Sequence, residues 1–131
     1  MVTLTPALEF EGLESGYDEA PVIVGVDLNL GEGEILTILG KNGMGKSTLL
    51  NLVGALDKPT SGEVRVDGQS LAGMSSEEAA LFRNQTVGFV FQSHHLLPSC
   101  TVLENVMVPA LAGHGDLTGM ALQTRAQELL E

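Results

Sequence analysis

One stretch, G-K-N-G-M-G-K-S-T at residues 40–48, constrains this chain more than any other. It fits the pattern G-x-x-x-x-G-K-[ST], a glycine loop that binds phosphate groups through its backbone. The loop follows an apolar, β-favouring run at residues 35–39 and precedes residues 49–56, which favour a helix weakened only by Gly54. The sequence therefore predicts a strand, a tight loop and a helix in that order, which is the setting that such a loop requires.

The residue types in this loop suit a nucleotide's phosphates and their metal ion. Its glycines can adopt positive φ, so that backbone N–H groups converge on an anion and the positive end of the helix dipole adds to the field. Lys46 brings an ammonium to the β- and γ-phosphates, and Ser47 offers its hydroxyl to Mg²⁺. The predicted nucleotide-binding residues of this stretch are Gly40, Asn42, Gly43, Gly45, Lys46, Ser47 and Thr48.

Charge and composition limit the kinds of binding partner and the cellular compartment that we expect for this chain. The 131 residues, enough for one domain at most, carry 17 acidic against 6 scattered basic side chains, a formal net charge of −11. Proteins that bind nucleic acid usually present a basic face, so the sequence argues against nucleic acid as a partner. The single cysteine, Cys100, suits a reducing compartment. Because neither a signal peptide nor a run of ~18 apolar residues is present, we expect a cytoplasmic chain.

Hydrophobic patterning predicts the other strands. Alternating apolar and polar residues indicate half-buried strands at residues 8–13, 22–30 and 63–67. The turns between the early strands are too short for a parallel crossover, so these strands should be antiparallel. A continuous apolar run at residues 87–91 indicates a buried strand that ends at Gln92.

Three further helices are predicted downstream of the loop. Serines and acidic residues start the first at residues 75–84. The second spans residues 101–112, with Thr101 as its cap and Glu104 at the third position after it. The third, at residues 118–131, is amphipathic. Its predicted apolar side consists of Leu122, Ala126, Leu129 and Leu130.

Several motifs in a fixed order resemble the N-terminal part of an ABC-transporter ATPase subunit. Tyr17 looks like that family's A-loop aromatic, residues 40–48 like its Walker A motif, and D-K-P-T-S-G-E at residues 57–63 like the turn that follows. Residues 90–92 are similar to its Q-loop. The resemblance implies that Tyr17 stacks on the adenine of ATP. It also implies that Gln92 contacts Mg²⁺ and the attacking water, so that Lys46 and Gln92 take part in catalysis and Ser47 and Gln92 bind the metal.

The resemblance also implies a fold, partners and a place in the cell. The fold is α/β, a P-loop NTPase with a RecA-like parallel core and an antiparallel β subdomain. A transmembrane permease subunit and a second ATPase subunit are the expected partners, which would place the chain at the inner face of a membrane. Residues 8–48 look like branched-chain amino-acid and urea uptake ATPases. Residues from 49 onward look like lipoprotein-releasing and macrolide-export ATPases, so we favour lipoprotein release.

Other motifs of the family are not found in residues 1–131. The sequence holds neither L-S-G-G-x-Q nor an apolar run ending in Asp-Glu. The chain is therefore interpreted as the N-terminal part of the domain, with an incomplete core. Phosphoryl transfer needs acids and water-orienting groups beyond Lys46, Ser47 and Gln92. We expect weak nucleotide binding without hydrolysis, and marginal stability or self-association from the uncovered sheet edge.

Two other classes of protein compete with this interpretation. A GTPase would carry N-K-x-D and a small kinase a lid with several arginines, and the sequence has no such motif and only three arginines after the loop. A non-enzymatic interaction module that uses residues 94–112 is the other class. The adjacent pair His94 and His95 is poorly spaced for a metal ion, and Cys100 has no nearby base to activate it.

Overall fold

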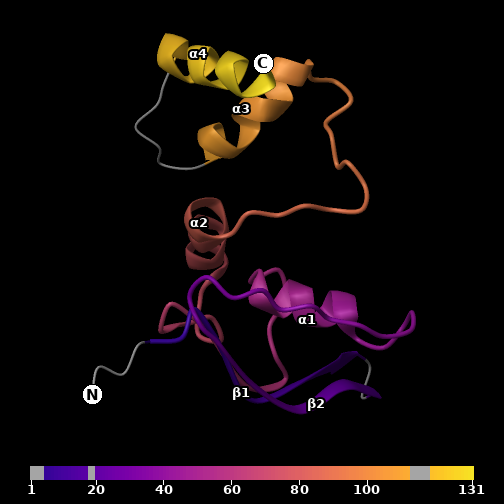
Figure 1. The fold of residues 1–131 in the computed structure, drawn as a ribbon. Helices are drawn as coiled ribbons and strands as arrows, with labels where there is room; N and C mark the ends of the chain where they lie inside the picture. Colours follow the sequence, from indigo (N-terminus) through magenta and orange to yellow (C-terminus); the bar gives the residue numbers. More distant parts are fainter. Residues whose placement is uncertain (1–4, 18–19, 113–118) are drawn as a thin grey trace. The chain divides into compact units, whose positions relative to one another are not determined.

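The computed structural model describes residues 5–17, 20–112 and 119–131 (Figure 1). The chain folds into two compact units, Met1–Ala80 and Leu81–Glu131. The elements, in chain order, are β1 (Leu8–Tyr17), β2 (Ala20–Leu30), α1 (Lys46–Val53), β3 (Ser61–Val66), β4 (Gln69–Ser70), α2 (Ser76–Thr86), α3 (Val102–Ala112) and α4 (Gly119–Leu130).

A four-stranded antiparallel sheet forms the base of the first unit. Its strand order is β2-β1-β3-β4, with Leu8 of β1 between Leu30 of β2 and Val66 of β3. Helix α1 lies over one face of this sheet (Figure 1), and the side chains of Leu13, Leu52 and Val64 are fully buried. The predicted antiparallel pairing is confirmed. The sequence pattern of these strands produces a continuous apolar layer between the sheet and α1.

Strand β1 continues four residues past its predicted end, to Tyr17. The pairing with β2 passes through register shifts between Phe10 and Leu13 and between Leu13 and Ser15. The N–H of Gly12 (φ 53°) donates to Asp27 Oδ1 at 2.6 Å. The side chain of Asp27 thus supplies the acceptor that the ladder lacks at the bulge, and pairing resumes beyond it.

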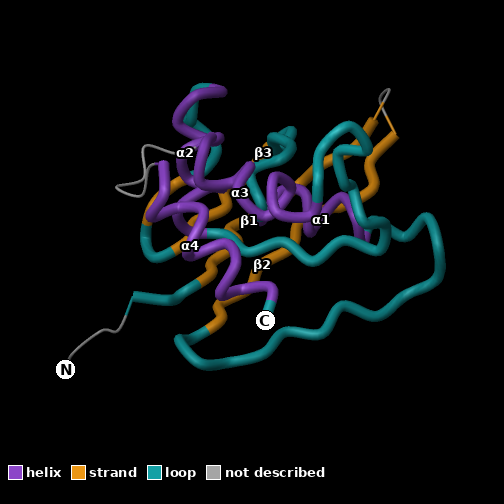
Figure 2. Tube along the Cα trace, turned by 90° about the horizontal axis from the view of Figure 1, so that it is seen from above, coloured by secondary structure: helices purple, strands orange, loops and turns teal. Residues whose placement is uncertain are grey.

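Two predicted strands, residues 35–39 and 87–91, are wrong: both segments are loop (Figure 2). The side chains of Ile35 and Leu39 are 92% and 87% exposed, and that of Val90 is 101% exposed. A strand needs a neighbour for its N–H and C=O groups. Among the described residues, no strand pairs with either segment, and their apolar sequences alone do not hold them in a sheet.

The three helices predicted downstream of the glycine loop form, with bounds within two residues of those expected where the structure describes them, whereas α1 begins and ends three residues before the predicted 49–56. Helix α3 begins with the predicted capping box: the Thr101 N–H donates to Glu104 Oε2 at 2.7 Å, and the Glu104 N–H donates to Thr101 Oγ1 at 3.3 Å. The Thr101 N–H and the Thr101 hydroxyl, which donates to Glu104 Oε2 at 2.8 Å, together hold the pKa of the Glu104 carboxyl below its usual range. Thr118, the predicted first residue of the last helix, lies outside the described residues.

The apolar side predicted for α4 is half right. Leu122 and Ala126 are buried, whereas Leu129 and Leu130 are exposed. Helix α3 is the element that packs on α4, and its cover does not extend to the last turn. Among the described helices, none has the length and hydropathy to cross a membrane.

Candidate functional site

The glycine loop has the conformation that an anion-binding loop requires. Gly43 and Gly45 lie in the left-handed region, with φ of 80° and 82°, while Gly40 does not, so two of the three glycines use their freedom. Helix α1 starts directly at Lys46. Its cap, Gly45, has no side chain to bond the first N–H groups, and its first turn has no acidic residue. These donors and the helix dipole are therefore available to a negatively charged ligand.

Gly45 also anchors the loop to the sheet. A Cβ placed on Gly45 would lie 2.9 Å from Val22 Cγ1 and 3.3 Å from the Val22 carbonyl oxygen. Only glycine allows the backbone to come this close to β2. The start of α1 is consequently held against the first residues of β2.

Lys46 folds back over the loop. Its Nζ donates to the carbonyl oxygens of Gly40 and Lys41, each at 2.7 Å. The ammonium is thereby held against the backbone of the glycine loop, and its role in phosphate binding stays a prediction. A phosphate oxygen would compete with these two carbonyls for the N–H donors of the Lys46 ammonium.

The neighbouring loop residues differ in accessibility. Asn42 and Ser47 are exposed and Thr48 is buried. Within the described part of the chain the Ser47 hydroxyl makes no hydrogen bond, so it is free to bind a ligand. Mg²⁺ in nucleotide sites takes few protein ligands and completes its shell with phosphates and water. One exposed hydroxyl beside the loop fits that role.

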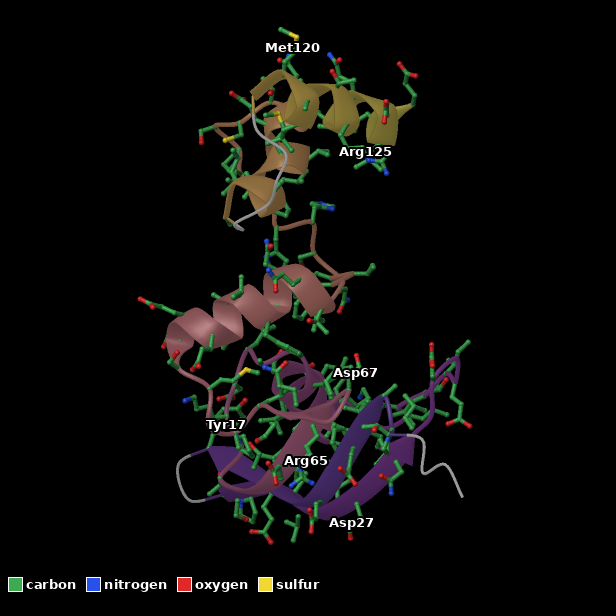
Figure 3. All side chains as sticks on the ribbon, turned by 90° about the vertical axis from the view of Figure 1, so that its left-hand side faces the viewer. Tyr17, Asp27, Arg65, Asp67, Met120 and Arg125 are labelled. Atoms are coloured by element: carbon green, nitrogen blue, oxygen red, sulfur yellow. The ribbon has the colours of Figure 1, made fainter. Side chains whose placement is uncertain are left out.

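Tyr17 is the last residue of β1 (Figure 3). It pairs with Ala20 of β2, two residues before Val22, which borders Gly45. Two strand residues span about 7 Å, so the tyrosine and the loop are close neighbours. The Tyr17 side chain is 52% exposed, and its hydroxyl donates to Asp57 Oδ2 at 3.1 Å. The structure thus brings together the aromatic residue and the loop that the sequence assigned to one nucleotide.

Two hollows lie at opposite ends of the β1–β2 hairpin. A hollow of about 520 Å³ adjoins Tyr17 and is lined by Glu14, Ser15, Gly16, Ala20, Pro21, Ile23 and Thr60. Ile23 also borders Gly45, so this hollow lies next to the glycine loop. A larger one, of about 690 Å³, is lined mainly by residues 29–34 and contains none of the predicted site residues. The smaller hollow is therefore the better candidate for nucleotide binding, because it adjoins Tyr17 and the glycine loop.

Gln92 belongs to the second unit. It is exposed in a loop rather than at the end of a strand, which corrects the predicted local structure. The preceding Phe91 ring stacks on Phe89 with centroids 5.3 Å apart and meets the His95 ring edge-on at 4.8 Å. These ring contacts stabilise the local conformation of the loop around Phe91. The role of Gln92 with Mg²⁺ and water stays a prediction.

The structure adds one residue to the site that sequence reasoning missed. Asp57 accepts the hydrogen bond of the Tyr17 hydroxyl, whereas the sequence identifies it only as the first residue of the D-K-P-T-S-G-E turn. Nothing in its local sequence signals a contact with a residue forty positions earlier. Among the described residues, no group of three His, Cys, Asp or Glu side chains is placed to hold a metal ion.

The sequence of the chain is similar to those of known proteins. The profile of the family described as ABC transporter matches residues 23–131. The lipoprotein-releasing system ATP-binding protein LolD of Anaeromyxobacter dehalogenans is 50% identical over 115 residues, which are 85% of this chain and 48% of that protein. LolD 1 of Caulobacter vibrioides is 44% identical over 131 residues, 97% of this chain and 56% of that protein.

Solved structures show the same fold. A dimeric, post-hydrolysis state of the ATP-binding cassette MJ0796 bound to ADP and Pi superimposes with a TM-score of 0.84 at 37% identity, covering 94% of this chain and 55% of that one. The chain spans about half the length of the relatives that it matches. The predicted α/β fold of P-loop NTPase type is confirmed. Because the family profile covers most of the sequence, the chain belongs to the ABC transporter family, and its relatives include LolD proteins.

Proposed function

We propose that this chain provides the ATP-binding residues of an ABC-type ATPase subunit that acts in lipoprotein release. The observation that carries the proposal is the arrangement around Gly45. The loop is docked on β2, the Lys46 ammonium is held over it, and Tyr17 lies at the same end of the hairpin. Phosphates would bind to the loop and the start of α1, and adenine would stack on Tyr17.

Each residue has one task in this proposal. The loop N–H groups and Lys46 hold the phosphates, and Ser47 and Gln92 would hold Mg²⁺, which neutralises charge on the phosphates when bound. Asn42 and Thr48 would contribute further contacts to the phosphates. Hydrolysis is not proposed for these 131 residues alone, because a water-activating acid is not among the residues assigned to the site.

The proposed partners follow from the relatives. LolD is named as the ATP-binding protein of a lipoprotein-releasing system, and the MJ0796 cassette is described as a dimer. We propose that this chain likewise works beside a second ATPase subunit and a transmembrane permease, at the cytoplasmic face of a membrane. Coupling to transport would depend on both partners.

Calorimetric titration of Mg²⁺-ATP into the wild type and Lys46→Ala tests the binding proposal. Removing a charged hydrogen-bond donor should weaken binding about 10- to 100-fold, because such bonds contribute about 1.5–3 kcal/mol. Lys41→Ala is the matched control, since the Lys41 side chain is exposed and only its carbonyl contacts Lys46. Wild type that is folded by circular dichroism and still binds no ATP would contradict the proposal, as would equal binding by Lys46→Ala.

A second candidate function is a module that docks on a membrane partner without using nucleotide. The observation that favours it is the apolar surface of the second unit. Leu96, Leu97 and Val102 are exposed and border a hollow of about 310 Å³. Binding to membrane-embedded partners that is unchanged in Lys46→Ala and in the absence of ATP would favour this candidate.

A further inference from the structure

The turn after α1, taken here as residues 57–62 with the first two residues of β3 included, is fixed to β1 at its far end. The Thr60 N–H donates to the Glu14 carbonyl oxygen at 2.9 Å, and Ser61 Oγ donates to Glu14 Oε2 at 2.9 Å. Gly62 has φ 77°, and a Cβ there would lie 2.2 Å from the Gly12 carbonyl oxygen, so only glycine fits. The turn is therefore held on the strand that ends in Tyr17.

The near end of the turn is fixed to α1. The N–H groups of Leu56 and Asp57 both donate to the Asn51 carbonyl oxygen, at 2.8 and 3.3 Å. Asp57 Oδ1 accepts the Lys58 N–H at 2.8 Å. One carboxylate oxygen is thus held by its own turn, and the other, Oδ2, is directed at the Tyr17 hydroxyl.

This contact holds the Tyr17 ring without covering it. A hydroxyl hydrogen bond lies near the plane of the ring, so the bond itself covers neither face of the ring. Half of the side chain is exposed, and among the described residues no aromatic ring contacts it. A flat, fixed and accessible aromatic face is what stacking with a nucleobase requires.

From these contacts we infer that Asp57 is a positioning residue, which orients Tyr17 for the base of the nucleotide. The inference rests on the proposed function and assigns a role to a turn that the sequence had only matched as a motif. Helix α1 then connects both parts of the site. Its N-terminus carries the phosphate loop, and its C-terminus, through Asn51 and Asp57, holds the base-stacking ring.

Two ligands separate the role of Asp57 from that of Lys46. Calorimetry with Mg²⁺-ATP and with Mg²⁺-triphosphate, which has no base, should be run on wild type, Asp57→Ala, Tyr17→Phe and Lys46→Ala. Asp57→Ala and Tyr17→Phe should lower ATP affinity about 3- to 10-fold, the effect of one hydrogen bond, and leave triphosphate binding unchanged. Lys46→Ala should weaken the binding of both ligands. Ser61→Ala is the matched control, because it removes a bond of the same turn that does not involve Tyr17.

The outcomes are distinct. Equal loss of ATP and triphosphate in Asp57→Ala would mean that Asp57 only supports the fold, and full ATP affinity in Asp57→Ala and Tyr17→Phe would mean that the contact does not matter. Either result overturns the inference and leaves the proposed function standing. If wild type binds neither ligand, or Lys46→Ala binds both as wild type does, the proposed function fails and the inference fails with it.

Fluorescence gives a second readout that a merely structural role would not move. Tyr17 is the only tyrosine and the chain has no tryptophan, so tyrosine emission reports this ring alone. A phenol bonded to a carboxylate emits weakly, so Asp57→Ala should be brighter than wild type and have lower anisotropy, while Ser61→Ala should match wild type. ATP, but not triphosphate, should quench the wild-type emission. Identical emission and anisotropy in Asp57→Ala and wild type would overturn the inference.

Discussion

At the scale of single residues, Gly45 has one requirement that Gly43 does not share. Both have φ near 80°. A side chain on Gly43 would meet no atom within 4 Å, whereas one on Gly45 would meet Val22 at 2.9 Å. The conformational cost of a Cβ therefore applies at both positions, and the steric cost at only one. A comparison of Gly43 with Gly45 therefore separates the conformational cost from the steric cost within one loop.

We predict that Gly43→Ala lowers the free energy of unfolding by about 1–2 kcal/mol, the cost of the left-handed region for a residue with a Cβ. Gly45→Ala should lower it further, because β2 and the loop must also move apart. Denaturant unfolding of both variants measures the difference. Equal destabilisation would show that Val22 yields without cost and that the loop is not anchored at Gly45.

At the scale of elements, the two halves of the predicted sheet behave differently. Residues 8–17 and 20–30 form strands because each finds its partner next to it in sequence or in β3. Residues 35–39 and 87–91 have equally apolar sequences, yet no partner strand exists among the described residues. Apolar composition favours burial, but backbone hydrogen bonds decide whether a strand forms.

Native-state hydrogen exchange should distinguish the two groups. Amides of residues 35–39 and 87–91 should exchange within about tenfold of the rate for an unstructured chain, because no strand in the described part of the chain offers them acceptors. The Leu13 amide in β1 should be protected to the level of global unfolding. Strong protection of residues 35–39 would mean that this segment pairs in solution, for example with a second copy.

At the scale of the whole molecule, exposed apolar side chains occur in both compact units. Ile35 and Leu39 belong to the first unit, and Val90, Leu96 and Leu111 to the second. No residue of α3 is fully buried, although its sequence is strongly apolar. Surfaces of this kind mark interaction sites or cause association.

We predict that the chain self-associates at micromolar concentrations, which sedimentation velocity would detect. Val90→Lys should weaken association without lowering stability, because the Val90 side chain is fully exposed. The control Leu13→Ala removes a fully buried side chain and should cost about 2–5 kcal/mol of unfolding free energy. A monomer with a sharp, concentration-independent unfolding transition would contradict the prediction.

The sequence by itself determined the local features of this protein. The glycine loop, the antiparallel hairpin, the Thr101 cap and the order of motifs that resembles ABC ATPases all depend on residues close together in the chain. Their physics is short-range: φ preferences, capping bonds and side-chain alternation. The family and the fold class were therefore predictable, while the roles of the individual site residues stay predictions.

Only the tertiary structure decided what depends on distant partners. The contact of Tyr17 with Asp57 and the packing of Gly45 on Val22 join segments that no local pattern relates. The loop structure of residues 35–39 and 87–91, and the exposure of Leu129, follow from the lack of a covering element among the described residues. A sequence pattern states which face should be buried, but burial requires a second surface, and only the folded chain shows whether one is there.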